Sequence, residues 1–233
     1  MSSAENQLIA ALPRALRNRL LARCEPVHLV LSQVLCEPGQ ASRHVYFPTQ
    51  GFVSLIAELD SAHGLEVGMA GLEGMVGVQL ALGVTREPLR ALVQGSGLSW
   101  RLTAAALREE LAHSPPLAQR LLRYAAVLMA QRARSAACLR FHEIGPRLSR
   151  WLLMSQDRAQ TAQFPLTQLF VASMLGVRRV GVTVAAGELQ RRGLIHYHRG
   201  DLTVLDRPGL EAASCSCYAA DRQTYTQTMG ERR

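Results

Sequence analysis

Residues 164–205 read FPLTQLFVASMLGVRRVGVTVAAGELQRRGLIHYHRGDLTVL, and this stretch decides the fold. Pro165 ends the preceding element, because a proline moves the residue before it out of helical conformations. Thr167 then predicts the N-cap of a helix over 168–175, since its hydroxyl can accept a backbone N–H of the first turn. Gly176 suits the left-handed conformation that closes such a helix.

A second helix is predicted over 178–192. Its inward row is Val182, Ala185 and Leu189. Ala172 in the first helix is small enough for two helices to cross closely. Gly176 makes the tight turn four residues later, and Val182, six residues further on, packs into the angle. These constraints together indicate a helix-turn-helix, in which a short turn joins two helices at a steep angle. The alternative is an αα-corner followed by an unrelated hairpin.

A hairpin is predicted directly after the second helix, where Gly193 stops the helical pattern. The apolar residues that alternate with polar ones are Ile195, Tyr197, Leu202 and Val204. An Arg-Gly-Asp turn at 199–201 separates the two runs, which is typical of a hairpin. We interpret it as a wing beside the second helix.

The totals of the 233-residue chain limit the class of protein. Hydrophobic residues make up 48% of the chain, enough for a packed core, and the formal net charge of +8 favours polyanionic partners. All Lys and Arg positions are arginine, which indicates a compositional bias, so the positions of the arginines are more informative than the net charge. The arginines concentrate after Trp100. No secretory leader and no apolar run of bilayer length is present, so we expect a cytoplasmic protein without a membrane partner.

The five cysteines are odd in number and scattered, namely Cys24, Cys36, Cys138, Cys215 and Cys217. A disulfide framework is therefore not expected, and a reducing compartment fits. One residue separates Cys215 from Cys217, which we interpret as poor spacing for a shared metal site. We expect no metal and a structural or incidental role for all five.

The N-terminal part of the chain contains a helical pattern, then a strand-and-turn pattern, with a glycine-dense stretch inside the latter. An amphipathic helical pattern covers 6–24 and is divided by Pro13; it predicts helices folded onto the following sheet, with a membrane-surface helix as the alternative. From 27 to 102, short β-branched and aromatic runs alternate with glycine and proline turns, which predicts an antiparallel roll of about eight strands. The glycine-dense stretch 71–78 is either an anion-binding helix start or a loop with a short buried helix.

A long helix is predicted over 115–141, with proline tolerated in its first turn. Its apolar seam is wide enough to pack on its own domain and on a partner helix. We assign the dimer contact to Leu121, Tyr124, Leu128 and Met129. Packing within a single chain is the alternative.

The predicted fold class is α+β, with an N-terminal antiparallel β-roll (jelly roll), a long central dimerisation helix and a C-terminal winged helix-turn-helix. The predicted boundaries are 1–114 for the N-terminal helix and roll, 115–141 for the long helix and 142–213 for the helix-turn-helix domain. The remaining 214–233 is predicted to be a polar, poorly ordered tail.

This order of parts resembles the Crp/Fnr-type transcription regulators over nearly the whole chain. In the roll, the resemblance rests on 37–39 (EPG), 45–48 (VYFP), 51–55 (GFVSL) and 73–77 (EGMVG). In the helix-turn-helix domain it rests on 166–168 (LTQ), Ala172, 174–179 (MLGVRR) and 189–195 (LQRRGLI). The resemblance implies a cytoplasmic homodimer that binds a two-fold-symmetric double-stranded DNA site, with RNA polymerase as a candidate partner.

Departures from the family pattern bear on the effector. Family members that bind cyclic AMP use a Gly-Glu pair and an Arg-Ser pair, but here Glu73 precedes Gly74 and no hydroxyl residue joins Arg90. Cyclic nucleotide binding in the usual way is therefore not expected. An iron–sulfur cluster would need four cysteines, mostly near the N-terminus, and is not expected either. The cofactor stays unknown, with Glu73, Gly74, Met75 and Arg90 as effector-binding candidates.

The DNA-reading residues are predicted at the start of the second helix, which would lie in a major groove. Arg178 and Arg179 are the best candidates, since arginine can donate two bonds to guanine. Val180 and Thr183 would make the remaining base contacts. The predicted phosphate contacts are Thr167, Gln168, Arg191, Arg199 and His198. For Arg191, a solvated helix end is the alternative.

Two other classes of function stay open. An enzyme is not expected, because the chain has no nucleophile elbow, metal-ligand spacing or phosphate-binding loop. A ligand-binding module, for a cyclic nucleotide or another small molecule, that acts only through protein contacts is the second alternative.

Overall fold

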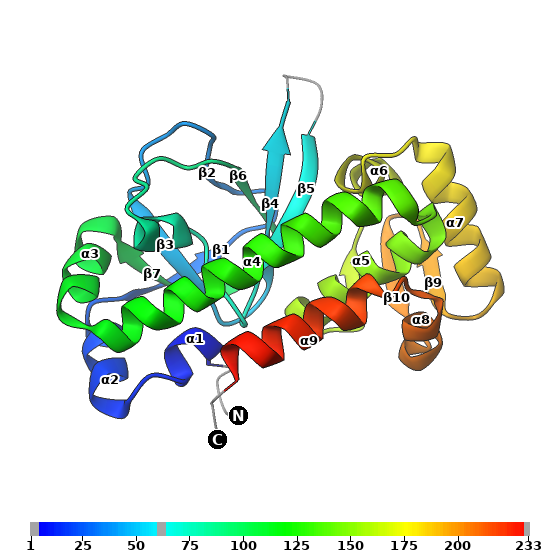
Figure 1. The fold of residues 1–233 in the computed structure, drawn as a ribbon. Coiled ribbons are helices and arrows are strands. Elements are labelled where there is room, and N and C mark those ends of the chain that lie inside the picture. The colour runs from blue at the N-terminus through cyan, green and yellow to red at the C-terminus, as the bar shows by residue number, and fades with distance from the viewer. Residues whose placement is uncertain (1–4, 60–63, 231–233) are drawn as a thin grey trace.

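The computed structural model describes residues 5–59 and 64–230. Figure 1 shows a β-roll at one end, a long helix that runs across the molecule, and a helical domain with a small sheet at the other end. The last helix returns from that domain along the long helix toward the roll. The α+β fold class predicted from the sequence is confirmed.

Two short helices precede the roll, as the amphipathic pattern predicts. They are α1 (Gln7–Ala10) and α2 (Arg14–Ala22), with Pro13 as the N-cap of the second. The Asn6 side chain is buried and accepts the backbone N–H of Leu8 at 3.1 Å. Its amide also donates to the carbonyls of Pro48 and Gly74 at 2.9 and 2.8 Å. One side chain therefore caps α1 and joins it to the roll.

The roll consists of two antiparallel sheets. Its strands are β1 (Glu25–Leu29), β2 (Val34–Cys36), β3 (His44–Pro48), β4 (Phe52–Glu58), β5 (Gly64–Ala70), β6 (Arg90–Gly95) and β7 (Gly97–Thr103). The strand orders are β1-β7-β3 and β2-β6-β4-β5. The sequence pattern predicts a roll of about eight strands, and the described residues form seven; β2 is the weakest of them, with three half-buried residues. The glycine-dense stretch leads into a short 3₁₀ helix, η1 (Val78–Leu82), which has two buried residues.

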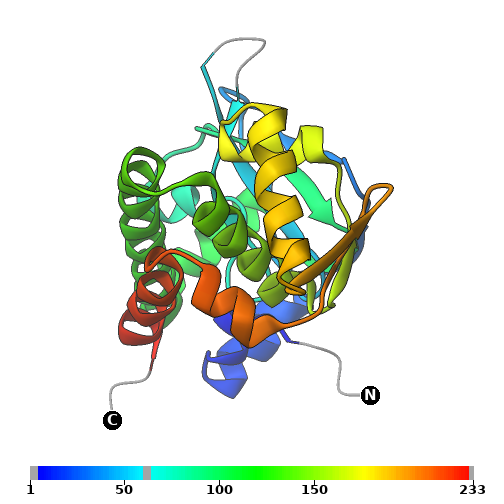
Figure 2. The same ribbon diagram turned by 90° about the vertical axis from the view of Figure 1, so that its right-hand side faces the viewer.

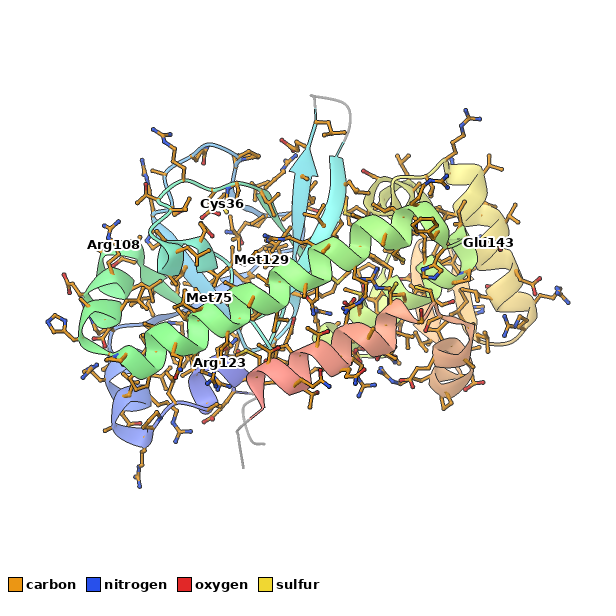
Figure 3. All side chains as sticks on the ribbon, in the orientation of Figure 1. Cys36, Met75, Arg108, Arg123, Met129 and Glu143 are labelled. Carbon is orange, nitrogen blue, oxygen red and sulfur yellow. The ribbon has the colours of Figure 1, made fainter. Side chains whose placement is uncertain are left out.

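The long helix α4 (Pro115–Phe141) spans the residues predicted for it and follows α3 (Ala104–His113). Its inward face closes the roll, because Leu121, Tyr124 and Leu128 are each at most 2% exposed within one core cluster of the roll. The assignment of these three residues to a dimer contact is therefore corrected: the chain's own roll covers them. Met129, by contrast, lies near the middle of α4 (Figure 3) and is 67% exposed.

The C-terminal domain places its helices on one small sheet. It contains α5 (Ile144–Ala159), α6 (Gln168–Leu175), α7 (Arg179–Arg191), α8 (Arg207–Ala213) and the strands β8 (Gln163–Pro165), β9 (Ile195–His198) and β10 (Asp201–Val204). The strand order is β8-β10-β9. The sequence analysis did not predict β8, which has three residues and one buried side chain; that residue, Phe164, pairs with Leu202 in the sheet.

The C-terminal tail is ordered, which corrects the prediction for 214–230; residues 231–233 lie outside the described part. Helix α9 (Cys217–Met229) packs along α4. The Asp221 carboxylate lies 2.5 Å from a guanidinium nitrogen of Arg134 on α4 and 2.6 Å from one of Arg150 on α5. At its far end, the Tyr225 hydroxyl donates to the carbonyl of Glu73 at 2.7 Å, and Met229 joins the roll core. This helix therefore ties both halves of the chain together.

The roll and the C-terminal domain also meet directly, through β5. The carboxylate of Glu66 accepts hydrogen bonds from the Ser54 hydroxyl at 2.5 Å and from the Trp151 indole N–H of α5 at 2.9 Å. Burial raises the pKa of Glu66 to about 7, while these two donors and nearby arginines pull it down. A titratable group therefore lies at the contact between the two halves.

The description of the cysteines as scattered is wrong for three of the five, while the structural or incidental role expected for them stays a prediction. Cys138, Cys215 and Cys217 form a buried cluster of their own, where α4 ends and α9 begins. Cys24 and Cys36 lie in the N-terminal half, away from this cluster; Figure 3 labels Cys36 in the roll and Glu143 just beyond the end of α4.

Candidate nucleic-acid interface

The turn between α6 and α7 has the geometry that the spacing predicts. The two helices are bent by 109° at the break between them, within the range of helix-turn-helix motifs. The Thr167 hydroxyl accepts the backbone N–H of Phe170 at 3.2 Å and so caps α6. Gly176 has φ +62°, a left-handed conformation that glycine adopts without a steric cost.

The inner faces of the two helices are buried as predicted. Ala172 and Val182 are 4% and 2% exposed in the same core cluster. The backbone N–H of Val177 donates to the carbonyl of Ala172 at 2.9 Å and so fixes the turn. With Val182, Ala185 and Leu189 turned inward, the opposite face of α7 is left to solvent.

That opposite face begins with the predicted reading residues. Arg178, Arg179 and Thr183 are exposed, and no carboxylate in the described part of the chain lies within ion-pair distance of either arginine. Val180 and Val184 are 72% and 67% exposed. Two valines on the solvent side of a helix, beside free positive charge, indicate a contact surface. Figure 2 shows α7 on the outside of the domain, not covered by another element.

Two of the predicted phosphate contacts have partners within the chain. The Thr183 hydroxyl donates to the side-chain oxygen of Gln168 at 2.7 Å, which leaves the Gln168 amide N–H groups free. Arg191 makes a forked ion pair with Glu188, at 2.7 and 2.8 Å from its two oxygens. The Glu188 carboxylate therefore offsets the charge of Arg191. This favours the alternative interpretation, in which Arg191 lies at a solvated helix end and does not contact a phosphate.

The predicted wing is present. Strands β9 and β10 pair with Asp201 opposite His198, and the two residues between them, Arg199 and Gly200, have φ of +47° and +89°. Positive φ at both central residues is the type I′ turn, whose twist suits a tight hairpin. The Arg199 side chain is exposed at the tip. The Tyr197 hydroxyl donates to the Leu166 carbonyl at 2.9 Å, which fixes the wing beside the start of α6.

The four effector candidates do not share a cavity, which corrects that prediction. Glu73 forms an ion pair with Arg158 at 2.8 Å, and a side chain at Gly74 would overlap the Tyr124 hydroxyl. Met75 is 1% exposed in the roll core. Arg90 is held by two carboxylates at 3.1 and 3.5 Å, from Glu58 and Glu37. Its charge is therefore not free for an anion.

The roll has a different cavity, of about 530 Å³. Its polar lining centres on Glu87, which is 6% exposed and accepts the Ser42 hydroxyl at 2.7 Å. The Gln79 amide donates to the same Ser42 oxygen at 3.0 Å. A buried carboxylate disfavours a phosphate beside it, although Arg43 also lines the cavity.

One pair of helices has the hydropathy of a membrane segment. Among the described residues, no single helix has the length and hydropathy of a bilayer span. Helices α6 and α7 have that length and hydropathy only when they are taken together, and a bend of 109° separates them.

Comparison with known proteins identifies the C-terminal domain and the fold. Residues 146–213 match the model of the Crp-like helix-turn-helix domain. The c-di-GMP-responsive global regulator CLP of Xanthomonas campestris is 19% identical over 82% of this chain and 99% of its own, with a TM-score of 0.67. A Crp/Fnr-family transcriptional regulator of Thermus thermophilus is 22% identical over 82% and 98%, with a TM-score of 0.65. A search of curated proteins found no match. The chain therefore has the fold of the Crp/Fnr regulators, and the resemblance is confirmed.

Proposed function

We propose that this chain, with its Crp-like helix-turn-helix domain at residues 146–213, is a cytoplasmic transcription regulator that binds an inverted-repeat DNA site as a homodimer. The observation that carries the proposal is the exposed face of α7. Arg178 and Arg179 stand at its start without acidic partners among residues 5–59 and 64–230, and Val180 and Thr183 follow on the same side. Arginine at the N-terminal end of such a helix can donate to guanine O6 and N7 in the major groove.

The phosphate contacts in this proposal come from the elements around α7. Three groups lie around the helix: the free amide N–H groups of Gln168, the Thr167 hydroxyl at the N-cap of α6, and Arg199 at the tip of the wing. Contacts of this kind set the register of the protein on the duplex without reading sequence. We leave Arg191 out of the set, because Glu188 holds its guanidinium.

The dimer contact in this proposal is the outer face of α4. Five residues recur on it at alternating spacings of four and three, and all are exposed: Leu122, Ala126, Met129, Ala133 and Ala136. This is the heptad spacing of two helices that pack along a shared seam. Alanine at three of the five positions lets two backbones approach closely, while Leu122 and Met129 supply the apolar contact area. Met129 is the one residue retained from the sequence-based assignment.

The roll serves as a sensor of unknown effector in this proposal. Its cavity is lined by the buried Glu87 carboxylate. Arg90, the arginine predicted to bind an effector, is paired with Glu37 and Glu58. We therefore expect no cyclic AMP bound in the way the cyclic-AMP-binding members of the family bind it. RNA polymerase is a further proposed partner.

The experiment is a selection of duplex sequences from random DNA by the full chain, followed by fluorescence anisotropy on the selected site. Replacing Arg179 by Ala should cost about 1–3 kcal/mol on that site and relax preference at one base pair. Arg108→Ala removes one exposed arginine from α3, at the far end of the molecule (Figure 3), and should leave affinity unchanged. Equal weakening by both variants, or no enrichment at all, would contradict the proposal.

A further inference from the structure

Four potential metal ligands converge where α4 ends. Cys138 lies in the last turn of α4, and His142 follows one turn later, with its backbone N–H donating to the Cys138 carbonyl at 3.1 Å. Cys215 lies between α8 and α9, and Cys217 is the first residue of α9. The backbone N–H of Cys215 donates to the Pro146 carbonyl at 3.3 Å, which holds the α8–α9 connection against the start of α5.

The distances between the four ligand atoms fit a single ion. All of them lie within 4.8 Å of one another. The sulfur atoms of Cys138 and Cys215 are 3.6 Å apart, as are the Cys217 sulfur and Nδ1 of His142. In a tetrahedral zinc site, bonds of about 2.3 Å to sulfur and 2.0–2.1 Å to nitrogen put neighbouring ligand atoms about 3.5–3.8 Å apart. A cluster of several iron atoms spreads its ligands more widely.

We propose that Cys138, His142, Cys215 and Cys217 form a mononuclear site for a divalent cation that prefers thiolate ligands, with zinc as the ion of best fit. Three cysteines and one histidine are a recurrent ligand set of closed structural zinc sites. The three cysteines are at most 6% exposed, so the site is shielded from solvent.

The surrounding charges suit this occupant. Three thiolates and one divalent cation carry a net charge of −1, and the buried Arg147 lines the same cavity as Cys138. Arg147 donates to the Leu175 carbonyl, and no carboxylate in the described part of the chain pairs with it. Arg150, the neighbouring buried arginine, shares the Asp221 carboxylate with Arg134. Arg147 and Arg150, which line the same cavity as Cys138, therefore place positive charge beside the thiolates.

The two halves of the ligand set come from the two ends of the DNA-binding domain in the sequence. Cys138 and His142 border the connection from α4 to α5, and Cys215 and Cys217 border that from α8 to α9. An ion held by all four fastens both ends of the domain to one point. This consequence does not depend on what the chain binds through α7.

The sequence contains a signal for this site, in a form that is easy to overlook. Cys138 and His142 are four residues apart, the spacing of neighbours on one helix face, although His142 is the C-cap of α4 and has an extended backbone. The Cys215–Cys217 pair is too close in sequence to suggest a site alone, but it becomes half of one when the chain brings it to the end of α4.

The first test measures metal in the full chain, purified without chelator, by mass spectrometry of the elements. We expect about one zinc per chain in the wild type, and its loss in Cys138→Ser and Cys217→Ser. Cys24→Ser and Cys36→Ser are matched controls from the N-terminal half and should retain it. Iron with acid-labile sulfide, or zinc lost equally from the control variants, would overturn the proposal.

The second test uses only the wild-type chain, so it does not depend on the folding of the variants. With zinc bound, an alkylating reagent should modify Cys138, Cys215 and Cys217 far more slowly than after chelation, whereas the half-buried Cys24 and Cys36 should react at the same rate in both states. Cobalt(II) added to the chelated protein should give the absorption of a tetrahedral ion together with thiolate-to-cobalt charge transfer. An alkylation pattern that zinc does not change, or a disulfide between Cys138 and Cys215, would refute the site.

Discussion

The Asp221→Asn substitution tests whether α9 is an integral part of the fold. The Asp221 side chain is 6% exposed and lies between Arg134 and Arg150, whose side chains are 27% and 10% exposed. The asparagine has the same shape but carries no charge, so Arg150 stays buried without its counterion.

The cost follows from the difference between the two arginines. Breaking a buried ion pair by removing one partner costs about 3–5 kcal/mol, because the remaining charge stays buried. Arg134 can turn toward water, and Arg150 keeps a hydrogen bond to the Ser135 hydroxyl at 3.1 Å, which moderates the loss. We therefore expect a fall of about 3 kcal/mol in the free energy of unfolding, at the lower end of that range.

Chemical denaturation followed by circular dichroism measures this loss, and hydrogen exchange of the α9 amides shows whether the helix detaches. Glu188→Gln is the control, because the ion pair between Glu188 and Arg191 is exposed, with side chains 47% and 75% accessible. An exposed pair of this kind is worth about 0–1 kcal/mol. If Asp221→Asn cost no more than the control, and α9 exchanged no faster, the assignment of α9 as a structural tie would be wrong.

Three further perturbations test the seam, the contact between the halves and the turn. Met129→Glu places a charge in the proposed seam, so sedimentation should show a shift from dimer to monomer; an unchanged dimer would exclude this face. Glu66 has a folded-state pKa of about 7, above its ordinary 4.5, so its protonated form favours the native state. Stability should fall as pH rises from about 4.5 to 7, by at most about 3 kcal/mol. A Glu66→Gln variant with the same slope in pH-dependent denaturation would contradict this. Gly176→Ala should destabilise by about 1–2 kcal/mol because of its positive φ, whereas Gly187→Ala, in an open helical position, should be neutral or stabilising; equal thermal shifts would refute that difference.

The helix-turn-helix could be predicted from the sequence because its constraints are local. The spacing of Ala172, Gly176 and Val182 reflects one crossing of two neighbouring helices, so a single chain carries all the information. The same is true of the α4 bounds, which proline and a break in the apolar pattern mark at either end.

The features that sequence reasoning missed depend on contacts between distant parts of the chain. Helix α9 has a weak apolar face, and much of what holds it comes from distant residues, including the Asp221 carboxylate between two arginines of other helices and Met229 in the roll core. Periodicity grouped Leu121, Tyr124 and Leu128 correctly on one face of α4, but it could not show that the roll covers that face. The effector candidates failed for a similar reason, because Glu73 and Arg90 each have an acid–base partner on another element.

The central claim is that two copies of α7 enter successive major grooves of one duplex. The most direct measurement is methylation protection of guanine N7 on the selected DNA site, with the wild type and with Arg179→Ala. We predict protected guanines in two half-sites about one helical turn, or 10 bp, apart, and loss of that protection in the variant. Protection that is absent, confined to one half-site or unchanged by the substitution would contradict it.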